Sequence, residues 1–390
     1  MRRPAHDPPM HVQTDSALTD EQRAFRDAVE EFALEELRPE AQQLDADETF
    51  PEDAWDDLAE LDLTGLTVPA EYGGFDADKT TYAVVNEAVA YGHLAVATAL
   101  SVHCLATSCI AEFGSDDVKE EWLPEMVDGR PVGAFCLSEP GAGSNPAEMT
   151  TTAEKTDDGY RISGEKQWIT NGERAGVYIV FAKTDPDDEG SITQFLVPAD
   201  YDGVEVGKKE HKLGLRASDT TGMTFDGVEI PEKYRLTPEG DGLSAAFKIL
   251  TGGRLAIASQ AVGVAQAALD EAIAYAGERE QFGKPIGDIG AIRQKMADMA
   301  TQVEASRLLC REAARQADAG EDSRVIASMA KYFASEAAMD VTNEAVQMHG
   351  GYGYMAEFDV ERFYRDAKIT TIYEGTSEIQ KTIIARSLLD

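Results

Sequence analysis

The hydrophobic period of the chain changes twice, and the order of those changes limits the fold more than any other feature. A period near 3.6 residues runs to about residue 128, and short apolar runs broken by turn signals fill residues 133 to about 234. The 3.6-residue period returns after Asp241 and holds almost to the end. This order is unlike a doubly wound α/β enzyme, in which strands and helices alternate. We therefore predict three domains: a helical domain over residues 1–132, a β domain over 133–238 and a helical bundle over 239–390.

Local signals mark several of the expected helices. Residues 19–22 (Thr-Asp-Glu-Gln) have the form of a capping box, and Phe25, Val29 and Phe32 follow on one helical face. In the last region, the pattern predicts long helices over 244–276, 289–317 and 323–348, then a short loop and a final helix from about Ser377. Residues 1–16 are polar and rich in Pro and His, so we expect them to be disordered.

The charge of the chain is strongly one-sided. Asp and Glu number 72 against 35 Lys and Arg, which gives a formal net charge of −37 spread along the sequence. Such a charge repels nucleic acid phosphates and anionic membranes, so neither is an expected partner. It also opposes compaction unless salt screens it, since the Debye length falls to about 3 Å at 1 M. We interpret the composition as adaptation to a salt-rich (halophilic) cytoplasm; an acidic protein of an ordinary cell is the alternative.

On the halophilic interpretation, KCl should stabilise the folded chain. We expect the melting temperature to rise between low salt and molar KCl, because screening weakens the repulsion among carboxylates. Thermal unfolding followed by circular dichroism at several KCl concentrations measures this effect. A melting temperature that stays constant or falls with salt contradicts the interpretation.

The cysteines and the apolar stretches indicate a cytoplasmic protein without a metal site. Cys104, Cys109, Cys136 and Cys310 form no C-x-x-C pair and no zinc spacing, so we expect reduced, buried thiols. No apolar run follows the arginines at positions 2 and 3, so we expect no signal peptide. The least charged stretch, residues 94–111, contains several Ser and Thr residues and a His, and it predicts a buried helix rather than membrane insertion.

Among the candidate catalytic residues, Glu374 has the setting of a general base. It stands between Tyr373 and Gly375 in the stretch 372–380. Apolar neighbours raise the pKa of a carboxyl group toward neutrality, and the glycine lets a substrate approach the backbone. A structural alternative has equal weight on spacing alone, because Thr376 and Glu378 could cap and charge the start of the next helix.

Other segments combine glycine with polar or aromatic residues. Residues 135–144 (Phe-Cys-Leu-Ser-Glu-Pro-Gly-Ala-Gly-Ser) expose backbone N–H groups to a polar ring or a phosphate, but in isolation a structural turn explains them better. Trp168 beside Thr170 is, on its own, typical of a core residue next to a turn. Arg279, before Phe-Gly, is as consistent with a helix cap as with a binding residue.

Five segments nonetheless resemble, in order, those of the acyl-CoA dehydrogenase family: 135–144, 166–172, 277–286, 347–354 and 372–380. The resemblance extends from about Thr19 to Asp390. It implies a fold that is mainly α with a central β domain, made of an N-terminal helical domain, a middle β-barrel domain and a C-terminal four-helix bundle. Residues 253–298 are most similar to short-chain and branched-chain members.

The resemblance also implies roles for individual residues. It makes Glu374 the catalytic base. For FAD it implies contacts from Phe135, Cys136, Leu137, Ser138, Gly143, Ser144, Trp168, Ile169, Thr170, Arg279, Phe282, Gln347, Met348, His349, Gly350, Gly351, Thr376, Ser377 and Glu378. For the acyl-CoA substrate it implies contacts from Ser144, Thr251, Gly252, Gly253, Arg254, Tyr373 and Gly375. Arg279 and residues 347–351 would reach the FAD of a neighbouring subunit, with His349 as a helix-end residue and not a base.

Two positions depart from the family pattern. Asn145 stands where the family usually has Asp, and Gly290 stands where it commonly has Gln, so one adenine-side contact is missing or supplied otherwise. Some members carry the base in the earlier helix that contains Thr251. No carboxylate occurs from Thr251 to Leu269, which leaves Glu374 as the plausible base.

The activity that this resemblance implies is FAD-dependent α,β-dehydrogenation of an acyl-CoA thioester to a trans-2-enoyl-CoA, in fatty-acid or branched-chain amino-acid catabolism. Glu374 would take the α-proton, and its own N–H with a flavin ribityl hydroxyl would stabilise the enolate oxygen. The β-hydride would pass to flavin N5, and an electron-transfer flavoprotein would reoxidise the flavin. The family layout implies a homo-oligomer, a dimer of dimers. An oxygen-reactive oxidase and a catalytically silent flavin-binding scaffold are the rival functions.

Overall fold

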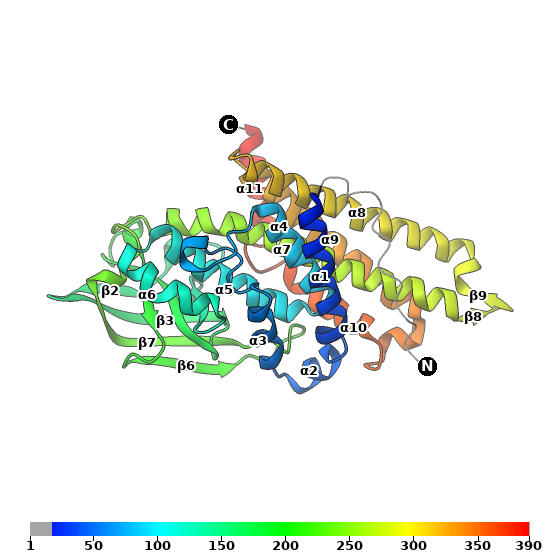
Figure 1. Cartoon of the computed structure of the whole chain (residues 1–390), viewed down its shortest axis with the longest axis horizontal. Helices are drawn as coiled ribbons and strands as arrows, with labels where there is room; N and C mark the ends of the chain where they lie inside the picture. Colours follow the sequence, from blue (N-terminus) through cyan, green and yellow to red (C-terminus); the bar gives the residue numbers. More distant parts are fainter. Residues whose placement is uncertain (1–17, 390) are drawn as a thin grey trace.

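The computed structural model describes residues 18–389, so the stretch for which we expected disorder lies outside the described residues. Helices come first, a sheet follows, and long helices complete the chain, as the hydrophobic period predicted. Figure 1 shows the sheet at one end of an elongated molecule and the longest helices extending toward the other end. The predicted class, mainly helical with a central β domain, is confirmed.

The first region is built from helices, two of which are buried over most of their length. The elements are α1 (Asp20–Phe32), a π-helical turn (Ala33–Leu37), α2 (Ala41–Asp47), α3 (Glu52–Glu60), α4 (Lys79–Gly92), α5 (Leu94–Phe113) and α6 (Asp116–Val127). The predicted capping box is present, because the Gln22 N–H donates to the Thr19 hydroxyl and the Thr19 N–H donates to the Gln22 side chain. Within residues 18–389, α5 is the one helix long and apolar enough to cross a membrane, yet 89% of its most apolar window is buried inside the protein.

The middle region forms one seven-stranded sheet. Its strands are β1 (Val132–Cys136), β2 (Thr152–Lys155), β3 (Gly159–Thr170), β4 (Ala175–Lys183), β5 (Ile192–Pro198), β6 (Val204–Lys209) and β7 (Thr220–Pro231). Neighbouring strands follow the order β1–β4–β2–β3–β7–β6, with β5 also paired to β4. No strand pair in the described part of the chain joins the two ends of this path, so its hydrogen bonds do not close the predicted barrel. The end strand β6 is largely exposed and carries Glu205, Lys208 and Lys209, which suit a solvated edge.

The last region contains three long helices and two shorter ones. These are α7 (Gly242–Glu278), α8 (Gly290–Asp318), α9 (Arg324–His349), α10 (Asp359–Thr370) and α11 (Ser377–Leu389), with a small hairpin, β8 (Glu280–Gln281) and β9 (Lys284–Pro285), between α7 and α8. The three long helices and α11 lie where the period predicted them. The loop predicted before Ser377 was wrong, because this stretch contains α10. Most of α10 is polar. Its apolar residues Val360, Phe363 and Ala367 are buried where the helix packs against α7 and α9, and this packing stabilises the helix.

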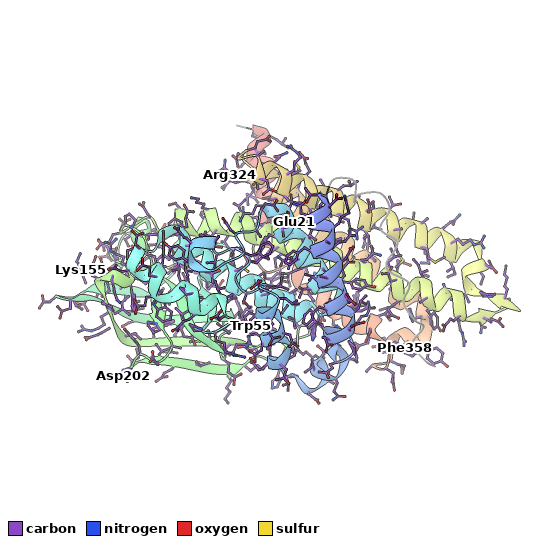
Figure 2. The ribbon with its side chains drawn as sticks, viewed as in Figure 1. Glu21, Trp55, Lys155, Asp202, Arg324 and Phe358 are labelled. Atoms are coloured by element: carbon purple, nitrogen blue, oxygen red, sulfur yellow. The ribbon has the colours of Figure 1, made fainter. Side chains whose placement is uncertain are left out.

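Two hydrophobic cores hold these parts together. One core joins α4 and α5 of the first region to α7, α8 and α9, and the other fills the space between the sheet and α5 and α6. Trp55 of α3 lies near the middle of the molecule (Figure 2), where its Nε1 donates to the Gly129 carbonyl at 2.9 Å and the Arg174 guanidinium lies 4.4 Å from its ring centre. The four cysteines are buried and form no disulfide, as expected.

Candidate active site

α5 forms the wall that brings the predicted segments together. The Thr98 hydroxyl lies 3.2 Å from the Tyr373 hydroxyl, next to the candidate base. The Ala99 carbonyl accepts a hydrogen bond at 2.9 Å from Nδ2 of Asn171, which belongs to the tryptophan segment 166–172. Farther along α5, the Leu105 Cδ2 atom lies where it would be 3.4 Å from a Cβ at position 253. One buried helix therefore contacts the base segment, the start of α7 and the end of β3.

Glu374 lies on a backbone conformation that few residues adopt. Its φ is 53° and that of Gly375 is 90°, so both residues are left-handed. The carboxylate Oε2 is shielded from solvent and has no hydrogen-bond partner among the described residues. Burial raises the pKa of Glu374 to about 7, although the charges of Lys331 and Arg254 oppose this rise. A carboxylate with these properties suits a general base that works near neutral pH.

Gly253 of α7 leaves room for that carboxylate. A Cβ atom at this position would lie 2.9 Å from Glu374 Oε2, which is closer than real Cβ contacts. A Cβ atom at Gly252 would meet nothing within 4 Å, so the adjoining backbone faces open space. Arg254 is buried, and its Nε has no partner among residues 18–389. The predicted substrate segment 251–254 is therefore in contact with the predicted base.

The segment that carries Glu374 is held from α9 and α11. Lys331 Nζ donates to the Gly375 carbonyl at 2.7 Å, and Gln380 Nε2 donates to the same carbonyl at 2.9 Å. The Ser377 hydroxyl donates to Glu336 at 2.6 Å. Thr376 Oγ1 accepts a long hydrogen bond of 3.4 Å from the Ile379 N–H. Thr376 therefore caps the start of α11, as the structural alternative predicted, and this cap is compatible with Glu374 as the base. The predicted FAD contacts of residues 376–378 stay predictions.

The glycine loop after β1 lies beside β3 and leaves its glycines open. The Gln167 N–H donates to the Ser138 carbonyl at 3.0 Å, so two predicted flavin segments are adjacent. A Cβ atom on Gly141 or Gly143 would meet nothing within 4 Å, and neither glycine has a positive φ. Since neither crowding nor backbone conformation requires glycine here, close approach of a ligand is a better reason for it. Asn145, one of the two departures from the family pattern, is exposed and donates to Glu148 at 2.9 Å.

Trp168 is turned outward by a bulge in β3. The pairing with β7 shifts register between Lys166 and Ile169, and Trp168 has a φ of 58° and is 59% exposed. The core position considered from the sequence was therefore wrong for Trp168, although Ile169 beside it is buried. An exposed indole on a strained backbone suits stacking against a flat ring.

A buried ion pair anchors the glycine loop to the sheet. Lys166 Nζ lies 2.8 Å from Glu139 Oε1, and the two side chains are 0% and 3% exposed. Glu139 also accepts hydrogen bonds from the N–H and hydroxyl groups of Thr150 and Thr151. Burial alone would raise the pKa of Glu139, but the charge of Lys166 and these hydrogen bonds lower it to about 2.

A second group of predicted residues lies at the far end of α7. A cavity of about 420 Å³ is lined by Arg279, Met348, His349, Gly350 and Gly351, together with Tyr275 and Tyr352. His349 stacks on Tyr275 with the ring centres 4.2 Å apart, and its Nδ1 donates to the Ala345 carbonyl at 2.8 Å. These contacts make it a helix-end residue, as expected. Phe358, which packs against this group, lies in the half of the molecule away from the sheet residue Lys155 (Figure 2).

These two groups cannot hold one dinucleotide within a single chain. Gly253 and Arg279 stand 26 positions apart (279 − 253) on and just after α7, which at 1.5 Å per residue is about 39 Å. The hairpin after Arg279 carries Phe282, which is 92% exposed at a turn where Phe282 and Gly283 both have positive φ. The structure therefore brings together segments 135–144, 168–170, 251–254 and 373–375, and it places Arg279 and residues 348–351 elsewhere.

Several residues of the site were not predicted from the sequence. Lys331 and Gln380 hold the base segment, and the Glu139–Lys166 pair holds the glycine loop. A signal existed for Lys166, because it shares the strand face of the buried residues Tyr160 and Ile162. Lys331 is a cation among the alanines of α9, a position where a buried charge needs a partner.

Three comparisons with known proteins agree with this arrangement. Models of the N-terminal, middle and C-terminal domains of acyl-CoA dehydrogenases match residues 19–130, 134–228 and 240–389. An acyl-CoA dehydrogenase of Bacillus subtilis is 44% identical over 95% of this chain and 99% of its own length. An acryloyl-CoA reductase (NADH) of Anaerotignum propionicum is 39% identical over 96% of each chain. The solved structure of butyryl-CoA dehydrogenase from Megasphaera elsdenii superposes with a TM-score of 0.93 at 40% identity, covering 96% of this chain and 99% of that one.

The three-domain fold and the open, ligand-ready loops define a flavin-dependent oxidoreductase. The chain belongs to the acyl-CoA dehydrogenase family, whose members use FAD and dehydrogenate acyl-CoA thioesters. The residues present fit that cofactor. Gly141 and Gly143 leave the loop open, Trp168 presents a free ring, and Arg279 has no acidic partner among the described residues beside its cavity.

Proposed function

We propose that Glu374 is the base of this enzyme and removes the α-proton of a short acyl-CoA, with an electron-transfer flavoprotein as the electron acceptor. The observation that carries the proposal is the shielded carboxylate oxygen without a partner, on a group whose pKa burial raises to about 7. The Glu374 N–H has no acceptor among residues 18–389, and so it is free to donate to the developing enolate oxygen. Bound FAD would supply the oxidising power by accepting the β-hydride.

The protein residues around the cofactor would mainly bind and orient. The loop with Ser138, Gly143 and Ser144 and the ring of Trp168 would hold the flavin and the near part of the substrate. Gly252 and Gly253 would leave the backbone of α7 open to the thioester, and Arg254 would place a positive charge nearby. Burial around Glu374 strengthens the interactions of its carboxylate because the local dielectric is low.

A buried polar network favours a short acyl chain. The Tyr373 hydroxyl donates to Gln260 Oε1 at 3.3 Å, and Gln260 Nε2 donates to Asn86 at 2.8 Å. Gln260 lies two helical turns beyond Gly253 on the same helix, and a long chain that displaced it would leave buried polar atoms unpaired. The similarity to a butyryl-CoA dehydrogenase supports the same size.

An anaerobic titration tests the reaction and ranks the substrates. We expect butyryl-CoA to bleach the visible flavin band of the purified protein in high salt, isovaleryl-CoA to bleach it less, and octanoyl-CoA least. A yellow protein that none of the three bleaches contradicts the proposal. A protein reoxidised rapidly by air alone would favour an oxidase. Steady oxidation of NADH coupled to reduction of an enoyl-CoA would favour the reductase direction, which the reductase relative makes the second candidate.

We also propose a cytoplasmic homo-oligomer, a dimer of dimers. The separation of the two predicted groups supports a site shared between chains, in which one chain lends Arg279 to the FAD of another. We expect Arg279→Ala to weaken FAD binding by roughly 10- to 100-fold, because a hydrogen bond to a charged phosphate is lost. Gel filtration measures how much FAD the protein retains, and light scattering on the same column measures the mass of the oligomer. Lys284→Ala, on the same hairpin, is the control. A monomer that retains FAD would contradict the shared site.

A further inference from the structure

We propose that Lys331 of α9 is a positioning residue for proton abstraction, whose buried ammonium fixes the Gly375 carbonyl and keeps the Glu374 carboxylate ionised. The inference rests on the proposed role of Glu374 as the base. It concerns a residue of α9, 43 positions before the base (374 − 331), that lies outside every segment in which the sequence suggested chemistry.

The first observation is the placement of the ammonium. Lys331 is fully buried, and its Nζ donates to the Gly375 carbonyl at 2.7 Å. That carbonyl belongs to the residue after Glu374, where the backbone is left-handed at both positions. A left-handed non-glycine residue stays in place when its surroundings hold it, and Lys331 and Gln380 are the two side chains that donate to this carbonyl among the described residues.

The second observation is the balance of charge around the base. Three elements face Glu374 with titratable groups: α9 with Lys331, α7 with Arg254 and α4 with Tyr82. Lys331 itself also faces Glu336 of α9 and Glu378 of α11. Burial lowers the pKa of Lys331 to about 8, while Glu374 and Glu336 oppose that change, so Lys331 is charged at neutral pH. The two cations therefore favour the carboxylate form of Glu374 against the effect of burial.

The two effects of Lys331 can be separated because Gln380 shares one of them. Gln380 also binds the Gly375 carbonyl and donates to the Glu374 carbonyl at 3.2 Å, but it carries no charge. Removing Gln380 should disturb the geometry alone. Removing Lys331 should disturb the geometry and also raise the pKa of Glu374.

The experiment measures flavin reduction by butyryl-CoA in anaerobic stopped flow as a function of pH, on FAD-loaded protein. For the unmodified protein we expect the rate to fall as pH drops through about 7, because Glu374 becomes protonated. In Lys331→Met this acidic limb should move upward by about one pH unit or more. At pH 6, the variant should therefore lose about 100-fold relative to its own plateau rate, against about tenfold for the unmodified protein. In Lys331→Arg, which keeps the positive charge, the acidic limb should return close to its position in the unmodified protein.

Two variants control for structure alone. Gln380→Leu should lower the plateau rate without moving the limb. Ser335→Ala, one turn along α9, removes a hydrogen bond of 2.9 Å to the Thr370 carbonyl and should change neither. A limb that stays in place in Lys331→Met, or that moves equally in Gln380→Leu, overturns the proposal. If Lys331→Met does not bind FAD, Lys331→Gln replaces it in the experiment. Gln keeps a hydrogen-bond donor but carries no charge, so the acidic limb should move upward in this variant as well. An unmodified protein that no acyl-CoA reduces would instead refute the proposed function itself.

Discussion

Glu374→Gln should retain FAD and lose flavin reduction by roughly 10²- to 10⁴-fold, the range that general-base catalysis contributes. The amide has nearly the same shape as the carboxylate, so it fits beside Gly253 without new crowding. It cannot accept the α-proton, because an amide is far too weak a base. Anaerobic stopped flow with butyryl-CoA measures the rate, and the visible spectrum reports the bound FAD.

A matched control separates this effect from a general change of acidity. Glu125→Gln replaces an exposed acid of α6, outside the segments of the site, and should leave the rate unchanged. Loss of FAD in Glu374→Gln would show that the residue supports the cofactor site instead. Full activity in that variant would refute the mechanism, since no other carboxylate occurs from Thr251 to Leu269 on the facing part of α7.

Most of the architecture could be predicted because the two hydrophobic periods are strong and long. The helices α7, α8 and α9 are each longer than 25 residues, and their patterns repeat through many turns. α10 was missed for the opposite reason. It is 12 residues long and mostly polar, and its three apolar anchors become informative when α7 and α9 are placed against them.

The candidate site was predictable where its chemistry lies in contiguous segments. Glu374, the glycine loop and Trp168 each stand in a short stretch that can be interpreted alone. Lys331 and the contact between Gly253 and Glu374 are different, because they arise when α7, α9 and the base segment meet in space. The spacing of residues along the sequence does not show which distant residues lie in contact. A buried charge in an apolar stripe, as at Lys331, is nevertheless a sequence signal that merits a search for its partner.

Lys166→Met should destabilise the sheet domain by about 3–5 kcal/mol, the cost of leaving a buried charge without its partner. Glu139 would keep its hydrogen bonds from Thr150 and Thr151 but lose the cation that helps hold its pKa at about 2. A carboxyl group with a lowered pKa in the folded state stabilises the fold above its unfolded pKa, and this contribution is lost as pH falls. The variant should therefore lose part of its stability near neutral pH and show a weaker dependence on acid. Urea unfolding followed by circular dichroism at pH 7 and pH 4 measures both.

Because Glu139 begins the turn of the glycine loop, the same variant should release FAD at lower urea than the unmodified protein. Two further variants make the result interpretable. Lys166→Met combined with Glu139→Gln removes both charges and should recover much of the lost stability, since a buried neutral pair avoids the unpaired charge. Arg161→Met, on the same strand as Lys166, breaks an exposed ion pair of 2.9 Å with Glu229 of β7 and should cost less than about 1 kcal/mol. If Lys166→Met costs no more than Arg161→Met, the buried pair does not anchor the loop, and the position of Ser138 and Gly143 must depend on the strand contacts alone.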